Sequence, residues 1–469
     1  MKITFFSAEV APFAKTGGLA DVCGALPLAL EKLGHDINIF MPGYRSIDHR
    51  EHPVKRLNTH VSMTMIGHHI GVYFIEHASF SDRDGLYGDA KGDYPDNLDR
   101  FQFFCLKSLQ VAKQLNVSME ILHCHDWQTA LIPVYLRSNL SKDEYFKGLK
   151  TVYTIHNLAY QGNFSKDQFD KLGVDGALFS TNGLEFYDKI NLMKGGILFA
   201  DEVTTVSPQY AQEIQTEQFG CGLHGVLQSR SKNIFGVLNG IDPNVWDPRN
   251  DPLITHQFSG ANLAGKAANK KELQKSYRLP EKENVPLIGS VGRLSHQKGI
   301  DLLLESADKI FEADIQMAIL GVGEERYHTQ LKKLQERFPD KLAVHLQFNE
   351  QFAHQIYAGS DFFLMPSVYE PCGLSQMISL AYGTIPVVFR TGGLVDTIVP
   401  YTENGNGIMF SEYTVPALCH AVRQAMDLYQ DQAAFTKLVQ KAFTYDFSWT
   451  ESARHYVDMY RECLTVGQV

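Results

Sequence analysis

The chain has 469 residues, a length typical of two domains of ordinary size. Hydrophobic residues make up 44% and charged residues 20%, the balance of a globular protein with substantial cores, and no apolar run is long enough to span a membrane. The formal net charge of −10 argues against non-specific binding to nucleic acid, so an anionic ligand would need a local basic site.

The cysteines indicate a reducing compartment. They are odd in number, scattered and without CxxC spacing: Cys23, Cys105, Cys124, Cys221, Cys372, Cys419 and Cys463. The first residues, Met1–Phe6, enter a strand pattern at once, whereas a signal peptide would show basic, apolar and small-residue stretches in turn. We therefore expect a protein of the cytoplasm or of a plastid-stroma-like space, with no membrane partner.

Short β-branched and aromatic runs alternate with longer helical patterns, which indicates parallel α/β sheets in both halves. The first half has predicted strands near 3–8, 36–41, 72–76, 121–125, 152–156 and 202–206. The second half has them near 287–291, 317–320, 343–347, 362–365 and 386–389. A turn-rich junction, Asn239–Pro243, predicts domains over 1–242 and 243–447. Residues 448–469 contain a last predicted helix, whose periodicity leaves open which domain it joins.

A glycine-rich loop, Lys15–Leu19, follows the first predicted strand, at the edge where α/β sheets bind ligands. Gly17 and Gly18 let the backbone approach a phosphate, the next helix offers amides, and Lys15 adds a charge. The segment 16–21 is echoed at 391–396, which we interpret as two glycine-rich loops that open helices; tight turns without a ligand are the alternative.

A basic segment, Gly292–Gly299, follows a predicted strand in the second half. Arg293 and Lys298 flank a short loop, so both are able to reach one diphosphate, the arginine as a planar fork and the lysine as a point charge. The alternative is that both are solvated cations on the surface. The flanking glycines and the position after a strand favour a binding role over this alternative.

A carboxylate, Glu370, lies at a strand-to-helix junction in the segment Tyr369–Leu374. Pro371 prevents a helix from continuing through it, and Gly373 permits an unusual turn. A fixed carboxylate there is suited to bind sugar hydroxyls and to favour an oxocarbenium-like transition state. It would equally serve as an anion near the start of the next helix.

Two segments resemble metal sites by their letters alone. His123–Trp127 reads as a cluster, but neighbours on a strand point to opposite faces. Asp82-Arg83-Asp84 spells a manganese signature in a polar loop, where we expect it to be solvated. We therefore predict no metal site. His156 ends a strand beside a polar lip, Tyr160–Gly162, and either a structural or a sugar-binding role is open.

Taken together, these segments resemble the glycogen and starch synthase family, in the family's order and over nearly the whole chain. They are 7–10, 15–22, 125–127, 153–162, 239–242, 292–301, 370–374 and 390–394. The resemblance implies a GT-B architecture, with two Rossmann-like domains facing across a deep cleft and the last helix crossing back to the first domain. It also implies transfer of glucose from ADP-glucose to the non-reducing 4-hydroxyl of glycogen or another α-1,4-glucan, with retention of configuration and without a metal or other cofactor.

The resemblance also implies roles for particular residues. The expected catalytic group is Glu370, His156, Arg293 and Lys298. The expected donor-binding group is Lys15, Gly17, Gly18, Asp126, Asn239, Phe348, Cys372, Gly373 and Leu374, with the diphosphate between the Lys15 loop and the Arg293–Lys298 pair. Asp21 and Tyr94 are expected on the acceptor side or in the cleft.

Two positions depart from related patterns. Phe348 stands where the family often has a tyrosine stacked on adenine, so the ring is retained without its hydroxyl. Ile378 stands where many retaining transferases have a second glutamate, which we interpret as a trait of this family. Since no second carboxylate offers itself as a nucleophile, we expect front-face attack with the departing diphosphate taking the acceptor's proton.

Three other functions compete with this one. A retaining GT-B enzyme that uses UDP-glucose is poorly separated by sequence, and a catalytically silent glucan-binding relative would not need Lys15, Arg293, Lys298 and Glu370 together. A nicotinamide-dependent oxidoreductase needs a dinucleotide fingerprint that neither half supplies.

Overall fold

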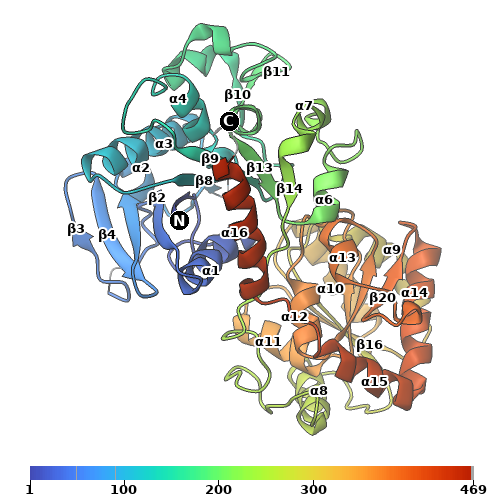
Figure 1. The fold of residues 1–469 in the computed structure, drawn as a ribbon. Helices are drawn as coiled ribbons and strands as arrows, with labels where there is room; N and C mark the ends of the chain where they lie inside the picture. Colours follow the sequence, from blue (N-terminus) through green and yellow to red (C-terminus); the bar gives the residue numbers. More distant parts are fainter. Residues whose placement is uncertain (49, 90, 466–469) are drawn as a thin grey trace. The chain divides into compact units, whose positions relative to one another are not determined.

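The computed structural model describes residues 1–469 except 49, 90 and 466–469, and the chain divides into two compact units. Unit 1 comprises Met1–Asn239 and Trp449–Val469, and unit 2 comprises Gly240–Ser448 (Figure 1). The chain thus changes unit after residues 239 and 448, against the expected 242 and 447, and the last helix belongs to unit 1. Among the described residues, no helix has both the length and the apolar character that crossing a membrane requires.

Unit 1 is built on a nine-stranded sheet in the order β14-β13-β9-β8-β1-β2-β5-β4-β3. From β14 to β5 the strands are parallel, and β4 and β3 add an antiparallel edge. The bounds are β1 Lys2–Phe6, β2 Asp36–Pro42, β3 Lys55–Arg56, β4 Val61–Ile66, β5 Ile70–Ile75, β8 Ile121–His125, β9 Lys150–Ile155, β13 Glu202–Thr205 and β14 Ile234–Gly236. Except for the edge strand β14, the parallel strands are largely buried on both faces, as their continuous apolar runs predict.

Helices and two small sheets complete unit 1. The helices are α1 Gly18–Lys32, α2 Ala78–Ser81, α3 Asn97–Gln114, α4 Leu131–Arg137, α5 Leu192–Phe199, α6 Pro208–Glu213, α7 His224–Ser229 and α16 Trp449–Thr465. The small sheets are β6 Gly88–Asp89 with β7 Gly92–Asp93, and β10 Asn163–Ser165 with β12 Lys189–Asn191 and β11 Glu185–Phe186. Short 3-10 turns cover Trp127–Thr129, Lys166–Leu172, Gly176–Leu178 and Ser231–Asn233.

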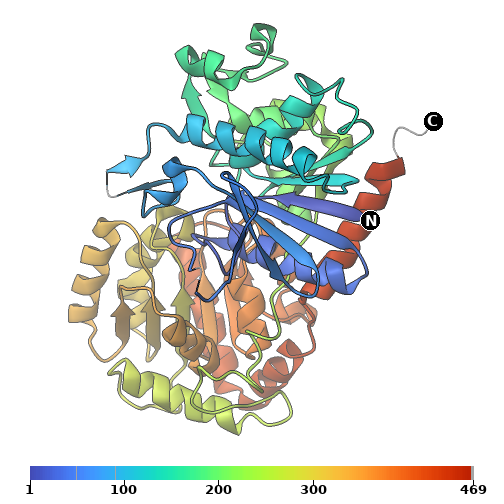
Figure 2. The ribbon, with the colours of Figure 1, turned by 90° about the vertical axis from the view of Figure 1, so that its left-hand side faces the viewer.

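The last helix, α16, packs against unit 1 through one apolar face. It lies beside α1 (Figure 2), and the hydroxyl of its Tyr460 is 2.7 Å from Nδ1 of His123 in the core. Tyr456 and Cys463 on the same face are also buried. Periodicity alone predicted this helix but not its place, because an apolar face does not name the surface that covers it.

Unit 2 is built on an all-parallel, six-stranded sheet in the order β17-β16-β15-β18-β19-β20. The bounds are β15 Leu287–Val291, β16 Gln316–Leu320, β17 Leu342–His345, β18 Phe362–Met365, β19 Ile385–Phe389 and β20 Ile408–Phe410. The helices are α8 Ala264–Ser276, α9 Ile300–Phe311, α10 Glu325–Arg337, α11 Glu350–Gly359, α12 Ser375–Ala381, α13 Gly392–Thr397, α14 Val415–Gln430 and α15 Gln432–Ala442, with 3-10 turns at His296–Lys298 and Tyr401–Glu403. Numbered within the unit, the strand order is 3-2-1-4-5-6, the Rossmann order.

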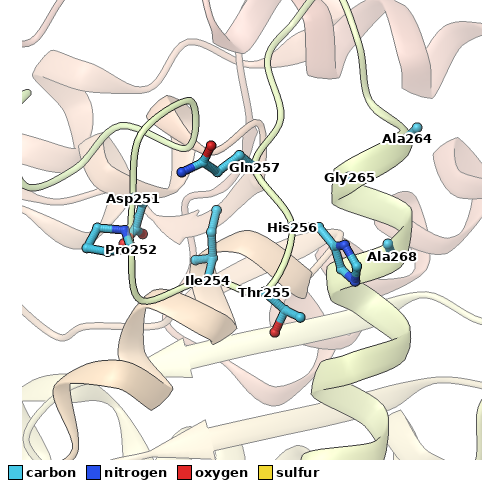
Figure 3. A pocket seen from close by; sticks show the side chains of 9 residues that line it. All are labelled: Asp251, Pro252, Ile254, Thr255, His256, Gln257, Ala264, Gly265 and Ala268. Atoms are coloured by element: carbon cyan, nitrogen blue, oxygen red, sulfur yellow. The ribbon is translucent and has the colours of Figure 1, made fainter.

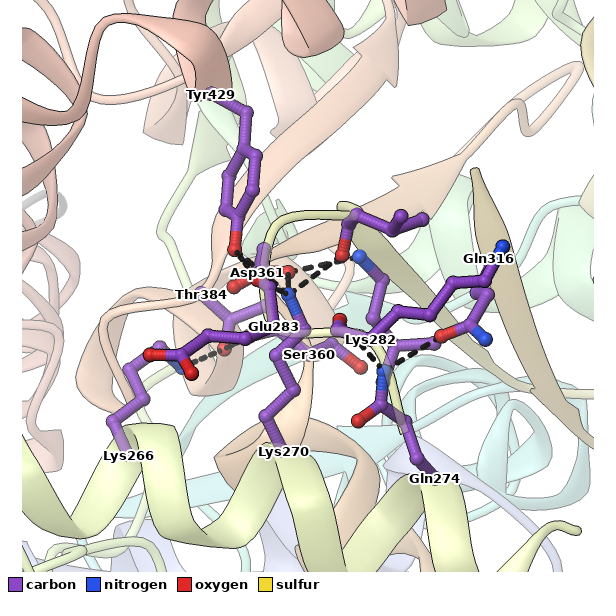
Figure 4. A network of polar contacts seen from close by, with 12 residues as sticks. Lys266, Lys270, Gln274, Lys282, Glu283, Gln316, Ser360, Asp361, Thr384 and Tyr429 are labelled. Carbon is purple, nitrogen blue, oxygen red and sulfur yellow. Dashed lines mark hydrogen bonds and ion pairs between the residues drawn. The ribbon is translucent and has the colours of Figure 1, made fainter. Parts of the chain in front are cut away.

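Two buried lysines of α8 fasten the amino ends of the unit 2 strands (Figure 4). Nζ of Lys270 is 2.7 Å from Oδ2 of Asp361, which directly precedes β18. Nζ of Lys266 donates to Oγ1 of Thr384, which precedes β19, at 2.7 Å. Burial lowers the pKa of Lys266 to about 7. The network lies at the opposite edge of the sheet from the carboxyl ends of the strands, and it therefore stabilises the frame of the unit.

Each unit has one topological switch point, where the strand order reverses. In unit 1 the first strand, β1, lies between β2 and β8; in unit 2 the first strand, β15, lies between β16 and β18. In sheets of this kind, ligands bind outside the carboxyl ends of the strands at such points. The loops after β1 and β8, and after β15 and β18, are therefore where each unit is expected to bind a ligand.

Candidate active site

The switch point of unit 2 contains an ion pair between Lys298 and Glu370. Nζ of Lys298 is 2.6 Å from Oε2 of Glu370, and the hydroxyl of Ser367 donates to the same oxygen at 3.0 Å. The side chain of Glu370 is 6% exposed and that of Lys298 is 24% exposed, so the carboxylate lies inside and the ammonium reaches the surface. The structure thus brings together two residues that the sequence placed 72 positions apart.

Two glycines let the loops around Glu370 pack closely. Gly299 has φ +74°, and a Cβ atom added to it would lie 1.8 Å from the carbonyl oxygen of Pro366. A Cβ atom at Gly393 would lie 2.1 Å from the carbonyl oxygen of Cys372, while the amide of Gly393 donates to the carbonyl of Glu370 at 3.0 Å. Three loops therefore surround Glu370, and two of them need glycine there for steric reasons.

Gln297 joins the loop after β15 to the loop after β18. Its side-chain Nε2 donates to the backbone carbonyl of Tyr369 at 3.4 Å. Its backbone carbonyl accepts a hydrogen bond from the backbone amide of Val368 at 2.9 Å. Nη2 of Arg293 lies 3.4 Å from Oε1 of Gln297. The sequence interpretation overlooked Gln297, although it lies between the two expected cations.

The other expected donor-binding residues of unit 2 lie at the same edge of the sheet. Cys372, Gly373 and Leu374 form the turn that leads into α12, with Gly373 at φ +74°. The helix begins at Ser375 with Leu374 in the cap position, so Glu370 is not the N-cap residue of α12. Phe348 follows β17, the third strand, and its ring is 86% exposed.

In unit 1, Glu9 organises the loop before α1. One carboxylate oxygen accepts the amides of Thr16 at 2.5 Å and Gly17 at 3.3 Å. The other accepts the hydroxyls of Thr16 and Tyr87, each at 2.6 Å. The backbone amides of Thr16 and Gly17 thus already have an acceptor in Glu9. Glu9 is 3% exposed, and sequence reasoning gave it no role.

The expected residues Lys15 and Asp21 meet each other in the same loop. Nζ of Lys15 is 2.6 Å from Oδ1 of Asp21, and their side chains are 53% and 33% exposed. Gly17 has φ −165°, extended backbone that any residue adopts, and nothing lies within 4 Å of a Cβ atom added at Gly17 or Gly18. The space beside these two glycines is therefore open to a ligand.

Asp126 and His156 lie at the carboxyl ends of β8 and β9. Oδ1 of Asp126 accepts the backbone amide of His156 at 2.8 Å, and Asp126 has φ 54°, a conformation rarely adopted by non-glycine residues. Burial raises the pKa of Asp126 to about 7 and lowers the pKa of His156 to about 3. Nε2 of His156 is 2.9 Å from Nδ1 of His125.

Asn239 and Tyr94 are the remaining expected residues of unit 1. Asn239 is 6% exposed, and its side-chain oxygen has no hydrogen-bond partner within the described part of the chain. The ring of Tyr94 lies against two guanidinium groups, with Cζ of Arg83 at 4.5 Å and Cζ of Arg100 at 5.1 Å from its centroid. A buried acceptor without a donor is the kind of group that a bound hydroxyl satisfies.

The segments that resembled metal sites by letters have other partners. His123 and His125 contact aromatic rings and hydroxyls in the core, and Asp84 is exposed beside Arg45. Among the residues that the structure describes, no group of three or more His, Cys, Asp or Glu side chains is placed to ligate a metal ion.

A cavity of about 600 Å³ in unit 2 lies apart from all of these residues (Figure 3). It is formed by the loop 251–257 and the first turns of α8. The carboxylate of Asp251 is already bonded to His354 at 2.8 Å and to Tyr382 at 2.6 Å. Its one buried acidic group is therefore structural, and the candidate site remains at the switch points.

Two Rossmann-like units, the second with a basic pair and a buried carboxylate at its switch point, define a glycosyltransferase of the GT-B fold. Comparisons with known proteins agree. The family described as "Starch synthase catalytic domain" matches residues 2–229, and "Glycosyl transferases group 1" matches residues 269–442. The catalytic domain of starch synthase IV from Arabidopsis thaliana, solved bound to ADP and acarbose, is 32% identical with a TM-score of 0.91, and 99% of each chain is covered.

Full-length relatives narrow the family. A glycogen synthase of Geotalea uraniireducens is 45% identical, with 99% of each chain covered, and one of Geotalea daltonii is 46% identical, with 98% of each chain covered. The chain belongs to the glycogen synthase family. The resemblance seen in the sequence motifs is therefore confirmed, and with it the fold class and the glycosyltransferase activity.

Proposed function

We propose that this enzyme transfers glucose from ADP-glucose to the 4-hydroxyl at the non-reducing end of glycogen or another α-1,4-glucan, with retention of the α configuration. The observation that carries the proposal is the Lys298–Glu370 pair at the unit 2 switch point, with Arg293 on the same loop. The ADP and acarbose of the starch synthase IV structure support an adenine nucleotide donor and a glucan acceptor.

The basic pair neutralises the leaving group. Arg293 binds the diphosphate as a planar fork, and Lys298 binds it as a compact charge. We propose that they supply the positive charge that a metal ion supplies in other transferases, so the reaction needs no metal and no other cofactor. Phe348, exposed after β17, offers a flat apolar surface on which an adenine ring stacks.

The carboxylate of Glu370 holds the donor glucose. In the free enzyme it bonds to Lys298 and Ser367, and when the diphosphate attracts Lys298 the carboxylate accepts hydrogen bonds from sugar hydroxyls. Its charge also favours the positive charge that develops at the anomeric carbon. The backbone around Cys372, Gly373 and Leu374 provides further donors at the same edge.

Transfer takes place by front-face attack. The acceptor's 4-hydroxyl oxygen bonds to the anomeric carbon as the bond from that carbon to the diphosphate oxygen breaks. The proton of the hydroxyl passes to the departing diphosphate, so no protein group has to accept it. The protein supplies positioning and electrostatic stabilisation, which together account for large rate gains.

Unit 1 contributes its own switch-point residues to substrate binding. His156, Asp126 and Asn239 offer buried polar groups for sugar hydroxyls, and the Lys15–Gly18 loop offers a charge and, beside Gly17 and Gly18, open space for a phosphate. Asp21 and Tyr94 are assigned to the acceptor side. The described cysteines are all free thiols, six of them buried, which supports the cytoplasm as the compartment.

The decisive experiment measures transfer of radiolabelled glucose to glycogen from ADP-glucose and, separately, from UDP-glucose, with EDTA present. We expect EDTA-resistant incorporation from ADP-glucose by the wild type and loss of it in Glu370→Gln, which keeps the shape of the side chain. Glu283→Gln, an exposed site in the same unit, is the matched control.

Each alternative has its own signature in this assay. Preference for UDP-glucose would replace the donor in the proposal and leave the chemistry standing. No incorporation from either donor by a folded wild type would favour a catalytically silent glucan-binding relative.

A further inference from the structure

Three histidine rings converge beneath the unit 1 switch point. His123 and His125 share one face of β8, and His156 directly follows β9. The ring centroids of His123 and His125 are 4.1 Å apart, and those of His125 and His156 are 5.2 Å apart. Phe5 of β1 stacks on His125 with an interplanar angle of 13°. The ring of His125 is therefore fixed in place by its neighbours.

The contact between His125 and His156 involves two neutral rings. Burial lowers the pKa of His125 well below its ordinary value, and it lowers the pKa of His156 to about 3. A neutral imidazole carries one N–H and one bare nitrogen. The 2.9 Å contact between Nδ1 of His125 and Nε2 of His156 therefore has one donor and one acceptor, and two arrangements satisfy it.

The other nitrogen of His125 distinguishes the two arrangements. Within the described residues, Nε2 of His125 is buried and has no hydrogen-bond partner. If His156 donated, His125 would carry its hydrogen on Nε2, as a buried N–H without an acceptor. If His125 donates through Nδ1, its Nε2 is a bare acceptor. Buried N–H groups without an acceptor are the rarer fault, so the second arrangement is favoured.

We infer that His125 is a positioning residue, which donates its Nδ1 hydrogen to His156 and so fixes His156 in the tautomer that carries hydrogen on Nδ1. His156 then presents an N–H donor to a sugar hydroxyl oxygen instead of a bare nitrogen. Asp126 fixes the main chain of His156 through its amide, whereas His125 sets the ring. The consequence for catalysis rests on the proposed contact of His156 with the donor glucose.

His123 provides a matched control on the same strand. Its Nδ1 is 2.7 Å from the hydroxyl of Tyr460, and its Nε2 is 2.6 Å from the hydroxyl of Thr154. Both nitrogens are thus engaged away from His156. Replacing His123 removes an equally buried ring without touching the bond that defines the tautomer.

The tautomer is measured directly by nitrogen NMR of protein labelled with ¹⁵N-histidine, with His156→Gln used to assign the signals. In the wild type we expect Nδ1 of His156 to be protonated and Nε2 to be bare. In His125→Leu this preference is lost, whereas in His123→Leu it is retained. Protonation of His156 at Nε2 in the wild type, or an unchanged tautomer in His125→Leu, overturns the inference.

Kinetics then separates positioning from a merely structural role. His125→Leu should raise the KM for ADP-glucose about tenfold, the effect of one misdirected hydrogen bond. His125→Asn should recover most of this loss, because its amide nitrogen is bonded to Cγ as Nδ1 is. Equal impairment of the Asn and Leu variants means that only packing matters, and contradicts the inference. If His156→Ala itself has wild-type kinetics, the proposed sugar contact fails, while the NMR result still decides the tautomer.

Discussion

The two units share the order of the parallel strands around the switch point but differ in how deeply they bury the same kind of ion pair. In each, a lysine in the loop after the first strand lies 2.6 Å from a carboxylate: Lys15 with Asp21 in unit 1, and Lys298 with Glu370 in unit 2. The side chains of the first pair are 53% and 33% exposed, whereas that of Glu370 is only 6% exposed. Exposed ion pairs contribute little to stability, whereas breaking a buried ion pair leaves one buried charge without a partner, which is costly.

The buried groups at the two switch points differ as well. Unit 1 has neutral rings and an acid whose pKa is raised, at Asp126, and unit 2 has charged groups. One strand order therefore supports two chemistries, because the loops and not the sheet determine which groups face the ligand. The polar set of unit 1 is suited to sugar hydroxyls, and the cations of unit 2 are suited to a diphosphate.

The largest expected effect comes from the cations of unit 2. Lys298→Ala and Arg293→Ala should each lower kcat on the order of a hundredfold or more, because a preorganised charge partner of the leaving group is lost. Lys298→Ala should also destabilise unit 2 by about 3 kcal/mol, since Glu370 stays buried without its partner. Initial rates with ADP-glucose and thermal unfolding measure both quantities.

Lys15→Ala is the control for the stability part of this prediction. It breaks a pair of the same length in the open, so the free energy of unfolding should change by less than about 1 kcal/mol. Near-normal turnover in both Lys298→Ala and Arg293→Ala would refute the assignment of the diphosphate to unit 2.

The pH dependence of stability should differ between the units. The pKa of Asp126 is raised from 3.8 to about 7, so its favourable contribution is present below pH 3.8 and is lost as the pH rises towards 7. Relative to that of the wild type, the free energy of unfolding of Asp126→Asn should therefore increase by on the order of 3 kcal/mol between pH 4 and pH 7.5. The pKa values of His123, His125 and His156 are lowered, so their contribution is present above pH 6.5 and is lost on acidification.

The stability of unit 2 should depend on pH in a different pH range. The pKa of Lys266 is lowered from 10.5 to about 7, so its contribution is present above pH 10.5 and is lost as the pH falls towards 7. Hydrogen exchange followed by mass spectrometry resolves the two units in one sample. If both units lost protection from hydrogen exchange to the same extent at every pH, the predicted difference in the pH dependence of their stabilities would be contradicted.

Glycine substitutions also distinguish the loops of the two units. Gly299→Ala should destabilise unit 2 by about 2 kcal/mol or more, because φ is +74° and the new Cβ atom meets the carbonyl of Pro366. Thermal unfolding and far-UV circular dichroism measure the loss. A variant as stable as the wild type would mean that the two loops separate easily, and that Gly299 has no steric role.

The sequence predicted the parallel strands and the loops that follow them, because buried strands are continuous apolar runs and their loops contain glycine next to charge. It missed the parallel edge strands β14 and β20, which have three residues each, and the antiparallel edge strands β3 and β4. The echo between 16–21 and 391–396 does open helices in both units, α1 and α13. The first loop follows strand one and the second follows strand five, so the two are not equivalent positions.

Contacts between distant residues account for the rest of what was missed. Glu9 accepts from Tyr87, 78 residues away, and His125 meets His156 across 31 residues. Neither pairing has a local pattern, because only the packing of the strands brings the partners together. Glu9 could have been suspected as an acidic residue in an otherwise apolar strand-to-loop junction, which has to be satisfied when buried.

The smallest expected effect on folding belongs to Gly17→Ala, and it is the most informative about the loop. Because φ is −165° and nothing lies within 4 Å of the new Cβ atom, the free energy of unfolding should change by less than about 1 kcal/mol. If this glycine is there for a phosphate to approach the backbone, the KM for ADP-glucose should nevertheless rise, while the affinity for glycogen is unchanged. A wild-type KM for the donor would assign the glycine to the fold of the α1 start and leave phosphate binding to unit 2.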